Sequence, residues 1–276
     1  MVKSINETLN EARNILKEKN IDEREARLLL AFSLEIKVEK LLLKKECSLR
    51  EYSKYMQIIN KRASGIPYAY IVGHKEFMKL DFEVNKNVLI PREDTEILVQ
   101  EVINLNKKKI LDMCTGSGCI AISLAKYIKD SEVTAVDISE KALTIAKLNA
   151  KKNEVDVKFI KSNLFEEVED KFDVIVSNPP YIKTADLEAL QTEVKNEPMK
   201  ALDGGETGLF FYKKIIKQAV NYLNENGILI FEIGFDQAED VCKLLNENGF
   251  KDIEVIKDLS GNDRVIKAKL VTLKEK

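Results

Sequence analysis

The sequence has few of the residues that mark a secreted, metal-binding or membrane-spanning protein. Its 276 residues include one histidine and four cysteines, and no two cysteines have the C-x-x-C spacing. This distribution provides neither a disulfide framework nor a zinc site, and it fits a reduced compartment. The first sixteen residues are charged throughout, unlike a signal peptide, and no stretch approaches the ~18 consecutive apolar residues that cross a membrane. We therefore expect a cytoplasmic protein with no metal and no membrane partner.

Proline and glycine are also sparse, at five and eleven residues, which leaves no room for a low-complexity linker. The net charge of −2 is uneven: residues 1–75 carry fifteen basic and ten acidic side chains, a net of +5, and the remainder carries −7. A chain with a net negative charge is not expected to bind nucleic acid over its whole surface. The basic segment could meet an acidic or RNA-associated partner, or it could be a solvated helical surface.

Three parts follow one another along the chain. In residues 1–75 apolar side chains recur at helical spacing and no glycine occurs before Gly65, so we expect a small bundle of about four helices. Residues 76–97 include a stretch of alternating apolar and polar side chains, from 77 to 88, which predicts a β-hairpin that links two domains. Residues 98–276 alternate between strand-like and helix-like segments and form the larger expected domain.

The larger domain is predicted to be α/β. Strands are expected at 110–113, 132–136, 155–160, 172–176 and 227–233, and helices at 118–128, 140–151 and 209–223. Strands that alternate with helices form a parallel, doubly wound sheet with helices on both faces. Such sheets bind ligands beyond the carboxyl ends of their strands, where the strand order switches.

A glycine-rich loop lies between the first expected strand and helix of this domain. Its sequence is Asp112-Met113-Cys114-Thr115-Gly116-Ser117-Gly118. The glycines allow a tight turn and a close approach of a ligand to the backbone, as in a dinucleotide fingerprint. However, Asp112 would repel a pyrophosphate, whereas it would attract a cationic sulfonium or an amino group. The loop therefore favours a sulfonium cofactor over a nicotinamide dinucleotide.

Two later strand ends carry side chains suited to a nucleoside. Asp137, followed by Ile138, ends the second expected strand, where a carboxylate can accept both ribose hydroxyl protons. The alternative role, a helix cap, is less favoured because Ser139 is the better cap. Asn163 and Leu164 follow the third strand and are expected beside an adenine, because asparagine offers both an acceptor and a donor to its edge.

The tetrapeptide Asn178-Pro179-Pro180-Tyr181 follows the fourth expected strand and points to the reaction. An amide or exocyclic amino nitrogen is a poor nucleophile because its lone pair is delocalised. Two acceptors, the side-chain oxygen of Asn178 and the carbonyl of Pro179, can hold its two N–H groups with the lone pair toward a methyl carbon. The paired prolines fix the backbone before the substrate arrives, and Tyr181 offers a face for a planar group. This predicts methyl transfer to a planar nitrogen, with Asn178, Pro179 and Tyr181 as the catalytic residues.

The chain resembles the peptide chain release factor glutamine methyltransferases (the PrmC/HemK family) nearly end to end. The segment 89–96, Leu-Ile-Pro-Arg-x-Asp-Thr-Glu, is the most specific match, because general methyltransferase domains lack it. The other matching stretches are Arg62-x-x-Gly65-x-Pro67, Glu197-Pro198, Gly204-Gly205, Gly208-Leu209 with Tyr212, Phe231-Glu232-Ile233-Gly234 and Asp258-x-x-Gly261-x-Asp263-Arg264.

The resemblance implies a Rossmann-like class I methyltransferase domain that methylates the glutamine of the Gly-Gly-Gln loop of release factors, with the helical domain recognising the factor. S-adenosylmethionine would be the donor and S-adenosylhomocysteine the product, and a monomer with no direct nucleic-acid partner is expected. The implied cofactor residues are Asp112, Cys114, Thr115, Gly116, Ser117, Gly118, Asp137, Ile138, Asn163, Leu164 and Asn178. The implied substrate residues are Asn178, Pro179, Pro180, Tyr181, Arg92 and Asp94. The chain departs from the family at Glu93, where proline is common, and at Asn163, where aspartate is usual.

Two other functions are compatible with parts of the sequence. Adenine-N6 and guanine-N2 methyltransferases of nucleic acids use a similar tetrapeptide, but they need a basic target-recognition region and this catalytic half is acidic. A regulatory protein that only binds the cofactor would not need paired acceptors. Two single residues remain open: Glu232 either contacts the ligand or orients a loop, and His74 is expected at the surface or in packing.

Overall fold

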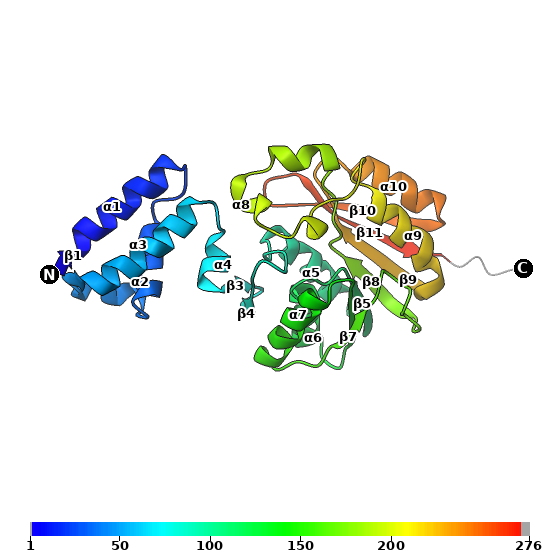
Figure 1. Cartoon of the computed structure of the whole chain (residues 1–276). Helices are drawn as coiled ribbons and strands as arrows, with labels where there is room; N and C mark the ends of the chain where they lie inside the picture. The colour runs from blue at the N-terminus through cyan, green and yellow to red at the C-terminus, as the bar shows by residue number, and fades with distance from the viewer. Residues whose placement is uncertain (1, 272–276) are drawn as a thin grey trace, which may run out of the picture. The chain divides into compact units, whose positions relative to one another are not determined.

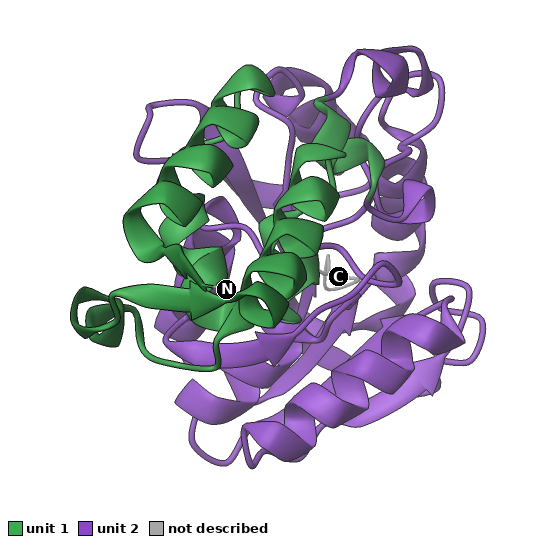
Figure 2. Ribbon diagram, turned by 60° about the vertical axis from the view of Figure 1, so that its left-hand side comes forward, with its two compact units in different colours: residues 1–73, 191–196 green, residues 74–190, 197–276 purple. Residues whose placement is uncertain are grey.

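The structure, a computed structural model, describes residues 2–271. The chain forms two compact units, which Figure 2 colours separately. The first comprises Met1–Gly73 and Gln191–Asn196, and the second His74–Leu190 and Glu197–Lys276. Within residues 2–271, none of the helices combines the length and the apolar character that crossing a membrane requires.

The first unit is built mainly of helices that close on one apolar core (Figure 1). They are α1 (Ile5–Glu18), α2 (Glu25–Ser33), the 3₁₀ helix η1 (Val38–Leu43), α3 (Leu49–Ala63) and α4 (Tyr68–Val72). A capping box begins α3, because the Ser48 side chain accepts from the backbone of Glu51 while the Glu51 side chain accepts from that of Ser48. Strands β1 (Val2–Ser4) and β2 (Glu46–Ser48) pair antiparallel. Sequence analysis missed them because three residues are too few to show alternation.

The first unit also includes Gln191–Asn196, a segment that follows the tetrapeptide in the chain and contains α8 (Thr192–Lys195). The buried guanidinium of Arg62 donates to Glu25 at 2.5 and 3.1 Å and to Glu193 at 2.5 Å. Gly65 has φ +94° and a side chain there would lie 2.4 Å from Thr192, so only glycine fits. The stretch from Arg62 to Gly65 thus holds α8 in this unit.

The second unit is a seven-stranded sheet with the order β10-β11-β9-β8-β5-β6-β7. Its strands are β5 (Lys109–Met113), β6 (Glu132–Asp137), β7 (Lys158–Lys161), β8 (Phe172–Ser177), β9 (Leu223–Glu232), β10 (Phe250–Lys257) and β11 (Asp263–Leu270). The α/β prediction is confirmed, and β5, β6, β7, β8 and β9 are parallel. One part of that prediction is wrong: β11 runs antiparallel to both β9 and β10. The short connection between β10 and β11 forces this reversal, because a parallel pair needs a long crossover.

Successive residues of the central strands point to opposite faces of the sheet, and each face has its own core. Leu111 and Ile175 belong to the core with α9 (Phe210–Tyr222) and α10 (Ala238–Glu247), whereas Ile110 and Val174 belong to the other. That second core includes α5 (Asp94–Leu105), α6 (Cys119–Tyr127) and α7 (Glu140–Lys152). Both faces of the sheet are therefore covered, as a doubly wound fold requires.

The predicted hairpin lies slightly earlier than expected, as β3 (His74–Phe77) and β4 (Leu80–Glu83), and belongs to the second unit. Its turn residues, Met78 and Lys79, both have positive φ, which is unusual without glycine or asparagine and which the sequence does not signal. Phe77 and Phe82 are buried in the core that contains α5 and α6. His74 is exposed, with its Nδ1 2.9 Å from Asp81, as the surface prediction required.

Candidate functional site

The glycine-rich loop and the tetrapeptide start side by side at the point where the strand order switches. From β5 the chain continues outward through β6 and β7, and then returns to place β8 on the other side of β5. Met113 and Ser177, the last residues of β5 and β8, are register partners, and the Ser177 hydroxyl donates to the Met113 carbonyl at 2.6 Å. The two segments that carry the chemistry therefore leave the sheet from adjacent strand ends.

Asp112 anchors the glycine-rich loop from inside the protein. It is fully buried, and its Oδ2 accepts from the Thr115 hydroxyl at 2.6 Å and from the Ala121 backbone N–H at 3.2 Å. Its Oδ1 is buried and has no hydrogen-bond partner among the described residues. One oxygen thus ties the loop to the start of α6, and the other is an acceptor for which the protein provides no donor.

The loop adopts a left-handed backbone at three positions. Gly116 and Gly118 have φ of +56° and +82°, and Cys114 has φ +65° although it carries a side chain. A side chain at Gly118 would meet Ile122 at 2.8 Å and the backbone of Ala146 at 3.3 Å, so glycine is required there. Cys114 accepts a conformation that is uncommon for a residue other than glycine, at a position that lines the site.

Asp137 holds the loop from the neighbouring strand. Its Oδ2 accepts from the Gly116 backbone N–H at 2.9 Å, and its Oδ1 accepts from that of Ser139 at 2.8 Å. Ser139, not Asp137, caps α7, because its hydroxyl accepts from Ala142. Burial raises the pKa of Asp137, and the backbone donors oppose that shift. Each carboxylate oxygen retains acceptor capacity for a ligand hydroxyl.

These loops line a pocket of about 1120 Å³ in the second unit. The predicted residues on its wall are Cys114, Gly116, Asp137, Ile138, Asn163, Leu164, Asn178 and Pro180. The other predicted residues do not line this pocket: Asp112, Thr115, Ser117, Gly118, Pro179, Tyr181, Arg92 and Asp94. Asn163 donates its side-chain N–H to Glu166 at 2.6 Å.

A large part of the pocket wall is formed by residues that the sequence did not predict as site residues. The unpredicted wall residues include Lys86, Asn87, Val88 and Leu89, several from Ser139 to Thr144, Ser162, and Pro198, Met199, Lys200, Ala201, Asp203, Phe210, Phe211 and Lys214. Two features of the sequence lie close to these residues. Leu89 begins the segment that most specifically matches the family, and Gly208-Leu209, another matching stretch, comes just before Phe210 and Phe211. Neither feature carries chemistry that would have identified a pocket.

The tetrapeptide is tied down at both ends. Asn178 Nδ2 donates to the Thr95 hydroxyl at 3.3 Å, and the Tyr181 hydroxyl donates to Glu232 Oε1 at 3.3 Å. The Tyr181 carbonyl accepts from Gln237 at 3.0 Å, and a side chain at Gly204 would lie 2.7 Å from Tyr181 Cα. Burial raises the pKa of the Tyr181 hydroxyl, which therefore stays protonated.

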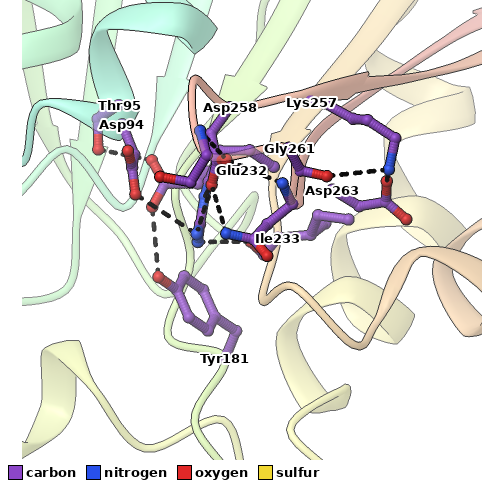
Figure 3. A network of polar contacts seen from close by, with 12 residues as sticks. Asp94, Thr95, Tyr181, Glu232, Ile233, Lys257, Asp258, Gly261 and Asp263 are labelled. Carbon is purple, nitrogen blue, oxygen red and sulfur yellow. Dashed lines mark hydrogen bonds and ion pairs between the residues drawn. The ribbon is translucent and has the colours of Figure 1, made fainter.

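The segment from Ile90 to Thr95 contacts three remote residues, Glu197, Arg264 and Glu232. Arg92 forms an ion pair with Glu197, whose other oxygen accepts from the Ile90 backbone at 3.0 Å. Asp94 lies 3.4 Å from Arg264, and the Thr95 hydroxyl donates to Glu232 at 2.5 Å (Figure 3). Partners from the chain itself thus engage both charged residues that the resemblance assigned to the substrate.

The burial of Asp112 predicts a pH dependence of stability. Burial raises its pKa from 3.8 to about 7, so between these values the folded chain keeps a proton that the unfolded chain loses. Stability then falls as pH rises across this window, by about 4 kcal/mol at most for this group. Urea unfolding at several pH values should show the wild type losing stability relative to Asp112→Asn as pH rises. Parallel profiles of the two proteins would contradict the assignment.

Comparisons with known proteins identify the family of the chain. The model of the methyltransferase small domain matches residues 93–194, and that of the PrmC N-terminal domain matches residues 7–73. A release factor glutamine methyltransferase of Clostridium acetobutylicum is 42% identical over 279 residues, which cover 96% of this chain and 98% of that one. One of Clostridium botulinum is 47% identical over 229 residues, 79% of this chain and 81% of that one.

A solved structure shares the fold of a large part of the chain. It is the 16S rRNA N2 G1207 methyltransferase of Thermus thermophilus, in complex with AdoMet and guanosine, with a TM-score of 0.51 and 15% identity. The match covers 71% of this chain and 56% of that one, and at this identity it shows the fold alone. The curated relatives decide the family, because their identity is high over nearly the whole length of both chains. The chain belongs to the release factor glutamine methyltransferase family.

Proposed function

We propose that the protein transfers a methyl group from S-adenosylmethionine to the side-chain amide nitrogen of a glutamine in a release factor. One observation carries the proposal beyond family membership. The register pair Met113 and Ser177 sets the tetrapeptide beside a glycine-rich loop, and Asn178 lies on the wall of the same pocket as Asp137. An acceptor for an amide N–H₂ group and a carboxylate suited to a ribose therefore share one cavity.

The pocket fits the proposed cofactor. Asp137 would accept from the ribose hydroxyls, Ile138 and Leu164 would contact the adenine, and the loop from Cys114 to Gly118 would lie along the methionine end. The buried, unpartnered Oδ1 of Asp112 lies behind this loop and favours a cationic ligand nearby. When bound, S-adenosylmethionine supplies an electrophilic methyl group on a positively charged sulfur.

The tetrapeptide would make the amide nitrogen reactive by orientation. Asn178 Oδ1 and the Pro179 carbonyl would each accept one N–H of the glutamine, which leaves the lone pair facing the methyl carbon. Tyr181 would pack against the planar amide, and its hydroxyl is already fixed by Glu232. A nitrogen–carbon bond forms as the carbon–sulfur bond breaks, and the nitrogen then loses a proton to solvent. No general base is required, and preorganised acceptors provide the rate gain.

The choice of glutamine over a nucleic-acid base depends on the family and on charge. Residues 76–276 carry a net charge of −7, which disfavours binding to a phosphate backbone. Residues 1–75, which carry a net charge of +5 and include most of the helical unit, would position the release factor. Within the catalytic domain, the ion pairs of Arg92 and Asp94 would fix the segment that holds Thr95 against the tetrapeptide.

Labelled S-adenosylmethionine and purified release factors provide the test. The protein should label a release factor with an intact Gly-Gly-Gln loop, and replacement of the loop glutamine should abolish labelling. Equal labelling of both factors would contradict the proposed site of methylation. Labelling of DNA or ribosomal RNA in place of the factor would support a nucleic-acid methyltransferase instead.

A further inference from the structure

A buried carboxyl group is connected by hydrogen bonds to both ends of the tetrapeptide, directly to Tyr181 and through Thr95 to Asn178. Glu232, the last residue of β9, is 2% exposed. Its Oε2 accepts from the Thr95 hydroxyl at 2.5 Å, and its Oε1 accepts from the Tyr181 hydroxyl at 3.3 Å. Figure 3 shows these three side chains converging from α5, β9 and the loop after β8. Thr95 in turn contacts Asn178, so one carboxylate is connected to the first and the last residue of the tetrapeptide.

Two hydroxyls and a guanidinium surround the buried carboxyl group of Glu232. Burial raises the pKa of Glu232 above its ordinary value, and the Thr95 hydroxyl, the charge of Arg264 and the Tyr181 hydroxyl offset only part of that shift. Asp94 is the nearby group that opposes ionisation, and Arg264 pairs with it at 3.4 Å. Arg264 is itself fixed, because it also donates to Asp258 at 3.1 Å and to the Ile233 carbonyl at 3.3 Å. The Thr95 hydroxyl donates to one oxygen of Glu232 and the Tyr181 hydroxyl donates to the other, so in this geometry both oxygens act as acceptors.

This acceptor determines which way the Asn178 amide points. A threonine hydroxyl has one proton, and the proton of Thr95 is committed to Glu232 at 2.5 Å. The Thr95 oxygen can therefore only accept from Asn178, and the group it meets at 3.3 Å is Nδ2. The Oδ1 of Asn178 must then face away from Thr95, and Asn178 lies on the pocket wall.

The direction matters because the two ends of an amide have almost the same shape. Packing alone does not distinguish Oδ1 from Nδ2, so hydrogen bonds must select one orientation. A flipped Asn178 would present N–H groups to the N–H groups of the glutamine substrate, and donor would oppose donor. The orientation that Thr95 imposes presents an acceptor to the substrate instead.

We propose that Thr95 and Glu232 are positioning residues for methyl transfer, which act by fixing the Oδ1 of Asn178 toward the substrate. This inference rests on the proposed function, since it needs the amide substrate for its effect on rate. It also gives a role to residues in three stretches that the sequence singled out, where Thr95 and the Asp258–Arg264 pair had no role and that of Glu232 was open. These stretches contain Thr95, Glu232 and the Asp258–Arg264 pair, and they meet behind the tetrapeptide.

The variant Thr95→Val keeps the shape of the side chain and removes its hydroxyl. We expect kcat to fall at least about tenfold, because the amide is then free to flip, while the affinity for S-adenosylhomocysteine stays unchanged. Thr95→Ser should restore most of the activity. Thr8→Val is the matched control, since Thr8 is buried in α1 and its hydroxyl has no hydrogen-bond partner among the described residues. A Thr95→Val enzyme as active as the Thr8→Val control would overturn the proposal.

A double-mutant cycle separates positioning from a general loss of structure. In an Asn178→Ala background, Thr95→Val should lower kcat by less than about twofold, because Thr95 has no amide left to orient. An equal loss in both backgrounds would show that Thr95 does not act through Asn178, and would overturn the proposal.

A measurement without substrate distinguishes failure of this inference from failure of the proposed function. In protein labelled with ¹⁵N-asparagine, the Asn178 side-chain N–H₂ should exchange slowly in the wild type and in Thr95→Ser, and rapidly in Thr95→Val. Equal exchange in the wild type and Thr95→Val would overturn the positioning role, whether or not the enzyme methylates a release factor. A wild type that methylates no release factor but shows the expected exchange would refute the function and retain the geometry.

Discussion

Replacement of Asn178 by alanine is expected to lower kcat by about 10²–10³-fold, with only a small loss of cofactor affinity. Its side-chain oxygen is one of two acceptors that would orient the amide nitrogen. The loss of one preorganised contact to a reacting group typically costs about 2.7–4 kcal/mol in the barrier. Single-turnover methylation of a release factor measures the rate, and calorimetry with S-adenosylhomocysteine measures the affinity.

The matched control for this prediction is Asn246→Ala. Asn246 lies on the exposed side of α10, where its side chain donates to the Cys242 carbonyl within its own helix. Its replacement should leave both quantities unchanged. If Asn178→Ala methylates at the rate of the control, the two-acceptor mechanism is wrong.

Asp137→Ala is expected to weaken cofactor binding by at least about 100-fold. Hydrogen bonds to a charged acceptor each contribute about 1.5–3 kcal/mol, and the carboxylate would accept from two ribose hydroxyls. The same change removes the acceptors of the Gly116 and Ser139 backbone N–H groups, so the glycine-rich loop loses an anchor as well. Asp137→Asn, which keeps one acceptor oxygen, should lie between the alanine variant and the wild type.

Calorimetry with S-adenosylhomocysteine tests this prediction directly. Asp240→Ala, at an exposed position of α10, is a control for the loss of one negative charge. A dissociation constant for Asp137→Ala within about threefold of this control would remove Asp137 from the cofactor site. A lower kcat with unchanged affinity would instead give Asp137 a role in the chemical step.

The alternation of strand-like and helix-like segments predicted most of the central sheet, because the spacing of apolar residues that marks each segment is a local property of the sequence. Strands β5, β6 and β8 lie within one residue of the expected ranges at each end, and α6 and α7 match equally closely. Each strand is short, apolar and followed by a helix with its own repeat, so neighbouring residues carry the signal. The reversal of β11 has no such local mark. It follows from the tight connection at Asp258–Gly261, where Asp258 accepts from the backbone of Ser260 and Asn262.

The helical segment α8 shows a different limit. Its residues follow the tetrapeptide closely in the chain, yet they belong to the first unit, where Arg62 holds Glu193 across 131 positions. No periodicity within Gln191–Asn196 could show this, because the partner that decides its place is remote in sequence. The sequence showed that the stretch from Arg62 to Gly65 matches the family, but it did not show that this stretch contacts Thr192 and Glu193 of α8.

The sequence by itself determined the reaction type, because the tetrapeptide, the glycine-rich loop and the carboxylate of Asp137 each carry their chemistry within a few residues. Only the tertiary structure decided how these groups are oriented. Thr95 and Glu232 are 137 positions apart, and they meet because α5 packs beside the carboxyl end of β9. The direction of the Asn178 amide depends on that meeting, since a side-chain hydrogen bond acts over about 3 Å and only the folded chain brings its partners so close.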